Sequence, residues 1–198
     1  MRHSETFRAR RLRFEEAGEE GFTLIELLVV LLIIGILLAI AIPTFLSVTK
    51  TANNTAAQAN LQTALTGADT FYTANNQTYA YLMWPTAVPA VSTITAIDTG
   101  LTYVSGSATT KSNTISLAAN GAAGWVVLAA YAPGTKDCWI IVDLKSAQTA
   151  TVAGLTSAQS SAWSTGTYYG VIKNGAAACT AATALAGTNY QTTGFPSG

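Results

Sequence analysis

The sequence predicts an α+β protein with one long N-terminal helix. The first half of that helix is expected to span a membrane, and its second half to pack on an antiparallel sheet of four to five strands. An uninterrupted apolar run, 22–42, is followed by a stretch in which apolar residues recur every three to four positions. After about residue 100 the pattern changes to short apolar runs bounded by turn residues, which is typical of β-strands.

The apolar run has the length of a membrane span. Phe22 to Ile42 would form a helix about 31 Å long, close to the thickness of a hydrocarbon core, about 30 Å. Arginines cluster just before it, at residues 8–13. By the positive-inside rule the N-terminus is then cytoplasmic, and everything after Pro43 lies outside.

The helix is expected to continue beyond Pro43 to about Ala74, where the turn-forming residues 75–77 end it. One face of this second half is apolar and should cover the sheet. The residues of that face are Val48, Ala52, Ala56, Ala59, Leu61, Leu65, Ala68 and Tyr72.

Five short runs are predicted to be strands. They are Leu101–Ser105, Asn113–Ala119, Trp125–Tyr131, Cys138–Leu144 and Thr167–Lys173. The segment 133–137 has the character of a hairpin turn, and 78–100 is expected to connect the helix to the sheet. The Ala/Thr/Gly-rich tail, 174–198, shows no periodicity.

The composition argues against several kinds of chemistry. After residue 21 the chain carries five Lys against Glu26 and four Asp, so it has no basic field and no specific nucleic acid is predicted. The only histidine is His3, which leaves 22–198 without a Ser-His-Asp or Cys-His arrangement. We therefore expect no enzyme activity and no cofactor.

Two aspartates are the candidates for metal binding. Asp137 and Asp143 flank one predicted strand and could join a calcium site. Solvated strand-end carboxylates are the more common reading of such residues, so no metal site is predicted.

The apolar run is either a signal peptide that is cut off or a segment that stays on the mature protein. A small-residue pattern, Ala39-Ile40-Ala41, would let a signal peptidase cut before Ile42 and release a soluble secreted binding domain. That reading leaves Glu26 unexplained, because a disposable apolar segment does not need a carboxylate.

A resemblance favours the other reading. Gly21 followed by FTLIE and an apolar run resembles the class III signal of type IV pilins and pseudopilins. The resemblance implies that a prepilin peptidase cuts between Gly21 and Phe22 and methylates the new amine of Phe22. The helix then stays on the mature protein, and Glu26 matches the glutamate of the family motif.

The position of Glu26 suits this role physically. Cleavage creates a cationic amine on Phe22, and Glu26 lies one helical turn along the chain. When such helices pack together, the amine leaves water and needs a partner. A buried pair adds little net stability but penalises any register that separates the charges, so Glu26 is predicted to set the register of assembly.

The resemblance also implies an organisation and a set of partners. A charged leader, 1–21, is removed; a long helix, 22–77, follows, with 22–42 in the membrane or filament core; and 78–198 form a β-rich head. The implied partners are further copies of the chain in a helical homopolymer, prepilin peptidase, an assembly platform with its ATPase, and the cytoplasmic membrane before assembly.

Two further expectations concern named residues. In the filaments of the family that the chain resembles, the segment that matches Gly35 to Pro43 can lose helicity when subunits pack, so the resemblance implies the same for residues 35–43. Because the resemblance implies export and the chain has no third cysteine, Cys138 and Cys179 are predicted to form a disulfide, as in the C-terminal disulfide-bounded loop of many type IV pilins.

The resemblance leaves two readings open. The first is the subunit of a type IV pilus-like filament, exported to the bacterial cell surface. The second is a pseudopilin of a type II secretion or DNA-uptake system, which shares the whole N-terminal argument. The small neutral residues and the head of about 120 residues favour the pilus.

Overall fold

The computed structural model describes residues 21–82, 94–147, 163–174, 179–182 and 190–196 of the chain. The chain divides into two units, Met1–Pro43 and Thr44–Gly198. Helix α1, Leu24–Ala74, begins in the first unit and ends in the second. The turn predicted after Ala74 is present, and Asn76 and Gln77 both have positive φ angles there (53° and 57°).

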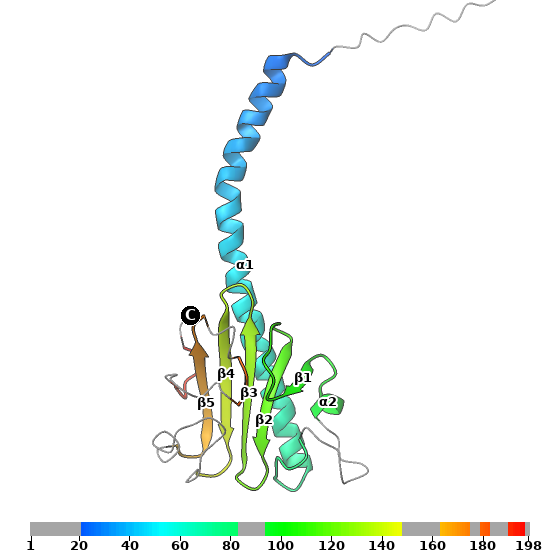
Figure 1. The fold of residues 1–198 in the computed structure, drawn as a ribbon, viewed down its shortest axis with the longest axis vertical. Helices are drawn as coiled ribbons and strands as arrows, with labels where there is room; N and C mark the ends of the chain where they lie inside the picture. Colours follow the sequence, from blue (N-terminus) through cyan, green and yellow to red (C-terminus); the bar gives the residue numbers. More distant parts are fainter. Residues whose placement is uncertain (1–20, 83–93, 148–162, 175–178, 183–189, 197–198) are drawn as a thin grey trace, which may run out of the picture. The chain divides into compact units, whose positions relative to one another are not determined.

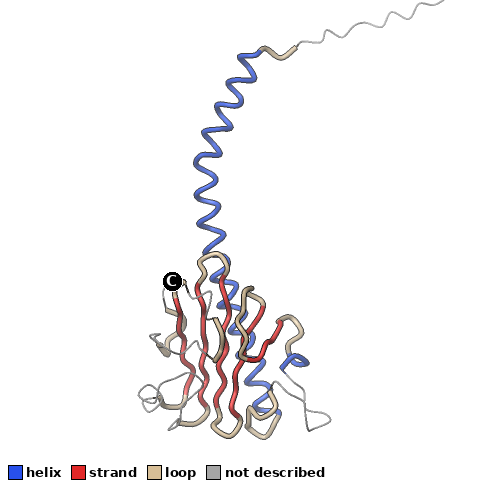
Figure 2. Tube along the Cα trace, in the orientation of Figure 1, coloured by secondary structure: helices blue, strands red, loops and turns tan. Residues whose placement is uncertain are grey.

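The second unit contains a five-stranded sheet in the order β1-β2-β3-β4-β5, with α1 on one face (Figure 1). The strands are β1 (Thr102–Ser105), β2 (Thr114–Asn120), β3 (Trp125–Ala132), β4 (Asp137–Leu144) and β5 (Gly166–Ile172). All five predicted strands are confirmed, and so is the α+β fold class. A short helix, α2 (Ile94–Ile97), lies in the predicted connection, of which 83–93 are outside the described residues (Figure 2).

The sheet is mixed, so the prediction of a wholly antiparallel sheet is wrong at one pairing. Strands β2 to β5 are antiparallel neighbours, but β1 runs parallel to β2, with Thr102 opposite Thr114. Parallel neighbours usually need a long crossover. Here β1 has only four residues, so the segment 106–113 is long enough to return the chain to the start of β2.

The central strands are buried on both faces, which explains their unbroken apolar runs. Every residue of β3 and β4 is buried. Alternate residues of β3, such as Val126 and Leu128, belong to the core under α1. Their neighbours, such as Val127 and Ala129, pack with Cys179 and Ala181 on the opposite face.

The packing face of α1 starts later than the sequence predicted. The buried helix residues are Ala57, Leu61, Ala64, Leu65, Gly67, Ala68 and Phe71. Val48, Ala52, Ala56 and Ala59 are exposed, so the predicted stripe is wrong over its first half and right for Leu61, Leu65 and Ala68. Small side chains are common both in the exposed part of this helix half and in the buried part. Their spacing in the sequence therefore does not show which of them contact the sheet.

A polar network ties the end of α1 to the sheet. The hydroxyl of Tyr79 donates to Asp143 at 2.7 Å, and Thr167 of β5 donates to the same carboxylate at 2.9 Å. The ammonium of Lys145 lies 3.0 Å from Asp143 and 2.7 Å from Asp69 of α1. Asp143, with a side chain only 4% exposed, is therefore fully paired.

This network shifts two pKa values in the same direction. Burial, with the nearby charge and hydrogen bond of Asp143, raises the pKa of Tyr79 far above its ordinary value. Burial alone would lower the pKa of Lys145, but its hydrogen bonds to Asp69 and Asp143 and their charges outweigh that effect and raise it. Both groups are thus held protonated by the fold.

Raised pKa values predict a loss of stability at high pH. A group that binds its proton more tightly in the folded state contributes stability that is complete below its unfolded pKa, about 10 here, and is lost above it. We expect the free energy of unfolding to stay level up to about pH 9 and to fall above pH 10, by about 1.4 kcal/mol per pH unit for Tyr79, with Lys145 acting in the same direction. Denaturation of the full chain in detergent solution at graded pH measures this.

The matched variant is Tyr79→Phe, which keeps the ring and removes the titrating hydroxyl. It should be less stable at neutral pH, because Asp143 loses a partner, and its stability should fall less steeply above pH 10. An equal slope in both proteins would show that Tyr79 does not titrate as the network requires.

Candidate functional site

The bond predicted to be cut lies just before α1 and is accessible. Gly21 and Phe22 precede the helix, and Phe22 is 84% exposed. A Cβ added at Gly21 would meet no atom within 4 Å among the described residues. No other described residue therefore crowds Gly21 at the predicted cut, and residues 1–20 of the predicted leader, 1–21, lie outside the described residues.

Glu26 is held at the N-terminus of α1 by Thr23. The carboxylate oxygen Oε2 accepts from the Thr23 amide at 2.9 Å and from its hydroxyl at 2.8 Å. The Glu26 amide in turn donates to the Thr23 hydroxyl at 3.3 Å. This reciprocal arrangement is a capping box, which satisfies backbone donors at a helix start and places a negative charge at the positive end of the helix dipole.

The capping box brings the carboxylate to the place where the new amine would form. Both bonds that Glu26 accepts from Thr23 end on Oε2. The Phe22 nitrogen is one residue before the Thr23 amide, so covalent geometry keeps it within a few ångströms of this carboxylate. Sequence reasoning identified Glu26 but missed Thr23, although the T-x-x-E spacing that signals a capping box is plain in the motif.

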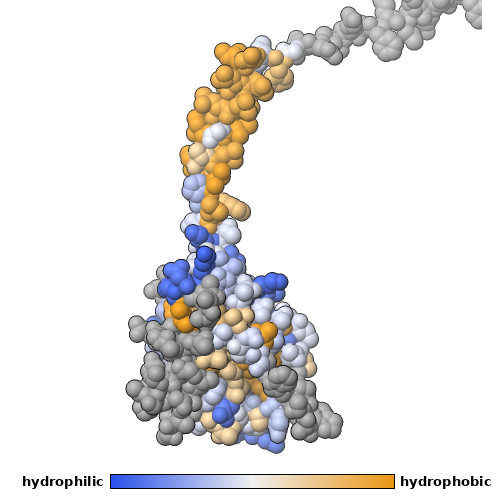
Figure 3. Space-filling view, in the orientation of Figure 1, coloured by the Kyte–Doolittle hydropathy of each residue, from blue (hydrophilic) through white to orange (hydrophobic). Residues whose placement is uncertain are grey.

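Between Glu26 and Lys50 the helix is exposed and mostly apolar. It is long and apolar enough to cross a membrane, and none of its most apolar window is buried. No charged residue occurs between Glu26 and Lys50. Figure 3 shows a mostly hydrophobic surface over this stretch, so it needs lipid or other helices around it.

Gly35 and Pro43 lie inside the helix without ending it. The helical assignment runs unbroken from Leu24 to Ala74 through both residues. Pro43 has no amide hydrogen, so it cannot bond the carbonyl of Ala39, and a Cβ at Gly35 would meet nothing within 4 Å among the described residues. A loss of helicity on packing stays a prediction.

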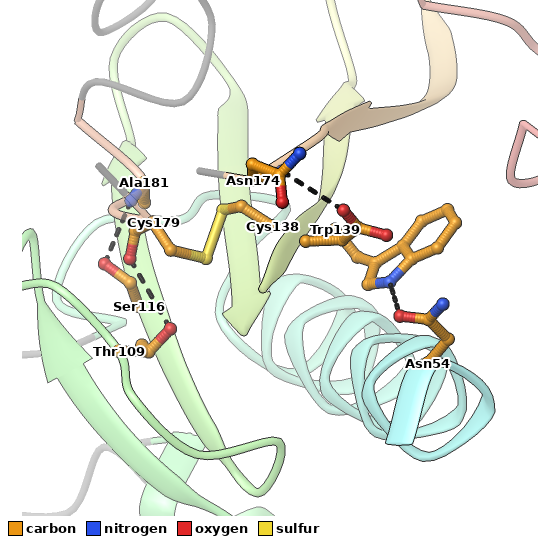
Figure 4. Close-up of a disulfide and its surroundings, with 9 residues drawn as sticks. Asn54, Thr109, Ser116, Cys138, Trp139, Asn174, Cys179 and Ala181 are labelled. Carbon is orange, nitrogen blue, oxygen red and sulfur yellow. Dashed lines mark hydrogen bonds between the residues drawn. A yellow bond between two sulfur atoms is a disulfide. The ribbon is translucent and has the colours of Figure 1, made fainter. Parts of the chain in front are cut away.

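The head carries the predicted disulfide. Cys138 of β4 bonds Cys179, and both are fully buried. The segment around Cys179 lies on the sheet face opposite α1, where the Thr109 amide donates to the Cys179 carbonyl at 3.0 Å. The Thr109 hydroxyl donates to the same carbonyl at 3.4 Å, and the Ala181 amide donates to Ser116 at 2.9 Å (Figure 4). The disulfide therefore fixes a C-terminal segment across β4 and β2.

The two aspartates weighed for calcium are not brought together. They occupy opposite ends of β4, and each is buried, so the reading as solvated strand-end residues is wrong. Asp137 accepts from the Asn174 amide at 3.2 Å and pairs with Lys173 at 3.4 Å, whereas Asp143 belongs to the network around Tyr79. Among the described residues no cluster of three or more potential metal ligands is present.

These features define a class of protein that has one long helix. The helix starts with a capped carboxylate, is long and apolar enough to cross a membrane, and packs with its later part on the β-sheet of a head. The model of the prokaryotic N-terminal methylation motif matches residues 17–42, which include Gly21, Phe22 and Glu26. This match indicates a type IV pilin-like or pseudopilin protein. Searches of curated proteins and of solved structures each found no match.

Proposed function

We propose that the chain is the structural subunit of a type IV pilus-like filament. It is stored as a precursor in the cytoplasmic membrane, with its N-terminus in the cytoplasm and its head outside. Prepilin peptidase cuts after Gly21 and methylates Phe22, and the mature chains polymerise through α1 with the help of an assembly platform and its ATPase. Its role is structural, with no catalytic step of its own.

One observation supports the proposal: the segment that matches the methylation motif, 17–42, contains the capped carboxylate of Glu26 at the start of an exposed apolar helix. A carboxylate next to a new amine would form a charge pair that is lost whenever neighbouring helices pack out of register. An exposed apolar surface would be covered by lipid before assembly and by neighbouring helices afterwards. The small neutral residues of the head favour a pilus over a pseudopilus.

Two substitutions test the cleavage route. Gly21→Leu adds bulk at the proposed cut, where nothing in the described fold opposes a side chain, so a failure to mature reflects processing rather than folding. Ala41→Leu removes the small residue that the rival signal-peptidase cut requires.

The expected result is that Gly21→Leu keeps its leader and yields no filaments in material sheared from cells, while Ala41→Leu matures normally. Maturation of Gly21→Leu together with a block in Ala41→Leu would instead favour a secreted soluble domain. Gel mobility and electron microscopy of the sheared fraction read out both results.

A further inference from the structure

The charges of the second unit are separated along the head. Its nine charged side chains, five Lys and four Asp, all lie within the described residues. The acidic side chains gather mainly toward the C-terminal end of α1, and three of the lysines toward the end where the chain enters from the apolar segment. The acidic group is Asp69, Asp98 and Asp143 with Lys145; the basic group is Lys50, Lys136 and Lys173 with Asp137.

The carboxylates of the acidic end have hydrogen-bond or ion-pair partners inside the head. Asp69 and Asp143 share the ammonium of Lys145, and Asp143 is buried. Asp98 accepts from the Tyr103 hydroxyl at 2.9 Å and from the Gly100 amide at 2.9 Å. Lys145 offsets one of the three negative charges, and the neutral donors to Asp98 leave its charge in place, so this end keeps two net negative charges.

The basic end is not compensated. Lys50 and Lys136 are exposed and have no ion pair among the described side chains, whereas Lys173 pairs with Asp137. Figure 3 shows hydrophilic residues gathered at this end of the head. Two net positive charges remain, and we call Lys50 and Lys136 the lysine pair.

Packing brings the lysine pair to the same end. The β3–β4 turn, 133–136, lies on α1: a Cβ at Gly134 would come within 2.9 Å of the Lys50 Cα, and Thr135 donates to Asn54 at 2.7 Å. Trp139 also donates its indole N–H to Asn54, at 3.1 Å. Lys136, the last residue of the turn, is thus held beside the helix turn that carries Lys50.

The backbone at Lys136 is unusual for a lysine. Its φ of 61° is in the left-handed region, which glycine and asparagine adopt most readily. Local turn geometry therefore favours glycine or asparagine there and does not explain the lysine.

Chain connectivity keeps the lysine pair near the membrane. Lys50 is eight residues after Ile42, the last residue of the proposed span, so it lies about 12 Å further along a helix. The polar headgroup layer is about 5–8 Å thick on each side, and charges act over about 8 Å in physiological salt. The lysine pair is then within reach of lipid phosphates.

We propose that the lysine pair binds the phosphate groups of anionic phospholipids in the bilayer that anchors the chain. This inference rests on the proposed membrane storage of the subunit. The contact would hold the head against the surface before assembly and would be released when the subunit leaves the bilayer. A second copy of the chain is a weaker candidate, because its acidic group would have to be brought to the lysine pair from another molecule, whereas the bilayer that anchors the chain is already within reach.

The test uses the full chain in liposomes of phosphatidylcholine, with and without phosphatidylglycerol. Brief acetylation followed by mass spectrometry gives the reaction rate of each lysine. Lys111 is the internal control: it is exposed, has no ion pair among the described residues, and its neighbour Ser112 bonds Asn60, about 15 Å further along α1 than Lys50.

We expect phosphatidylglycerol to slow acetylation of Lys50 and Lys136 about fivefold, to leave Lys111 unchanged, and to lose its effect at high salt. Lys136→Asn, which suits the turn, should reduce the protection of Lys50. Equal rates in both liposomes would overturn the inference, and so would protection that follows protein density rather than lipid charge, because that pattern indicates a second copy.

Alkaline extraction of the same liposomes separates the two proposals. If the chain resists extraction while its lysines stay equally reactive, only the lipid contact fails. If the chain is extracted, the proposal of membrane storage is contradicted, and the proposal of the lipid contact is contradicted with it.

Discussion

Replacing Glu26 by glutamine is expected to abolish filaments while the chain remains folded and in the membrane. Glutamine can still accept the Thr23 hydrogen bonds, so the capping box survives and only the charge is lost. In packed subunits the Phe22 amine would then lack its partner. Leaving one charge unpaired in apolar surroundings costs about 3–5 kcal/mol, a loss of roughly a hundredfold or more in the association of each subunit.

The matched control is Thr23→Ala, which removes the cap and keeps the carboxylate. It should weaken the helix start by about 1 kcal/mol and still yield filaments. The measurement is the amount of chain in sheared material relative to the membrane fraction. Normal filament yield from Glu26→Gln would show that the charge does not set the register of assembly.

Removing the disulfide is the second change with a large expected effect, this time on the head. The bond closes a loop with a sequence separation of 41 residues, for which the chain-entropy estimate is about 3–4 kcal/mol. A double variant, Cys138→Ala with Cys179→Ala, should lose about that much free energy of unfolding. Denaturant titration of the full chain in detergent solution measures the loss.

A second variant separates the covalent link from the packing that accompanies it. Ser116→Ala keeps the disulfide but removes the acceptor of the Ala181 amide, so it should cost about 1–3 kcal/mol for the buried donor left unpaired. If the double cysteine variant loses less than Ser116→Ala, the local hydrogen bonds hold the C-terminal segment and the disulfide adds little.

The fold was largely predictable because its elements follow local patterns. The apolar run ending at Ile42 and the turn residues after Ala74 set the bounds of the long helix, and the short apolar runs became β1 to β5. The hairpin between β3 and β4 was also found, because PGTKD combines turn residues between two strongly apolar strands.

Other features depend on contacts that local patterns do not encode. The parallel pairing of β1 with β2 arises from how the segment 106–113 returns across the sheet. The burial of Asp143 depends on partners from distant segments, Tyr79, Lys145 and Thr167. A sequence shows an aspartate at a strand end, but not that three donors converge on it.

The candidate site divides in the same way. Gly21, Phe22 and Glu26 were found because they form one contiguous motif, which the match over residues 17–42 covers. Thr23 was missed because a second reading of the same few residues, the capping box, was not applied. The lysine pair could not be predicted, because only the folded turn brings Lys136 beside Lys50.

The most direct test of the filament proposal is the mass of the N-terminal peptide, measured on chains from cell membranes and from sheared filaments. We expect membranes to contain precursor and mature chains, and filament chains to begin at Phe22 with one methyl group on its amine. Chains that begin at Ile42 would contradict it, because the helix proposed to build the filament would have been discarded.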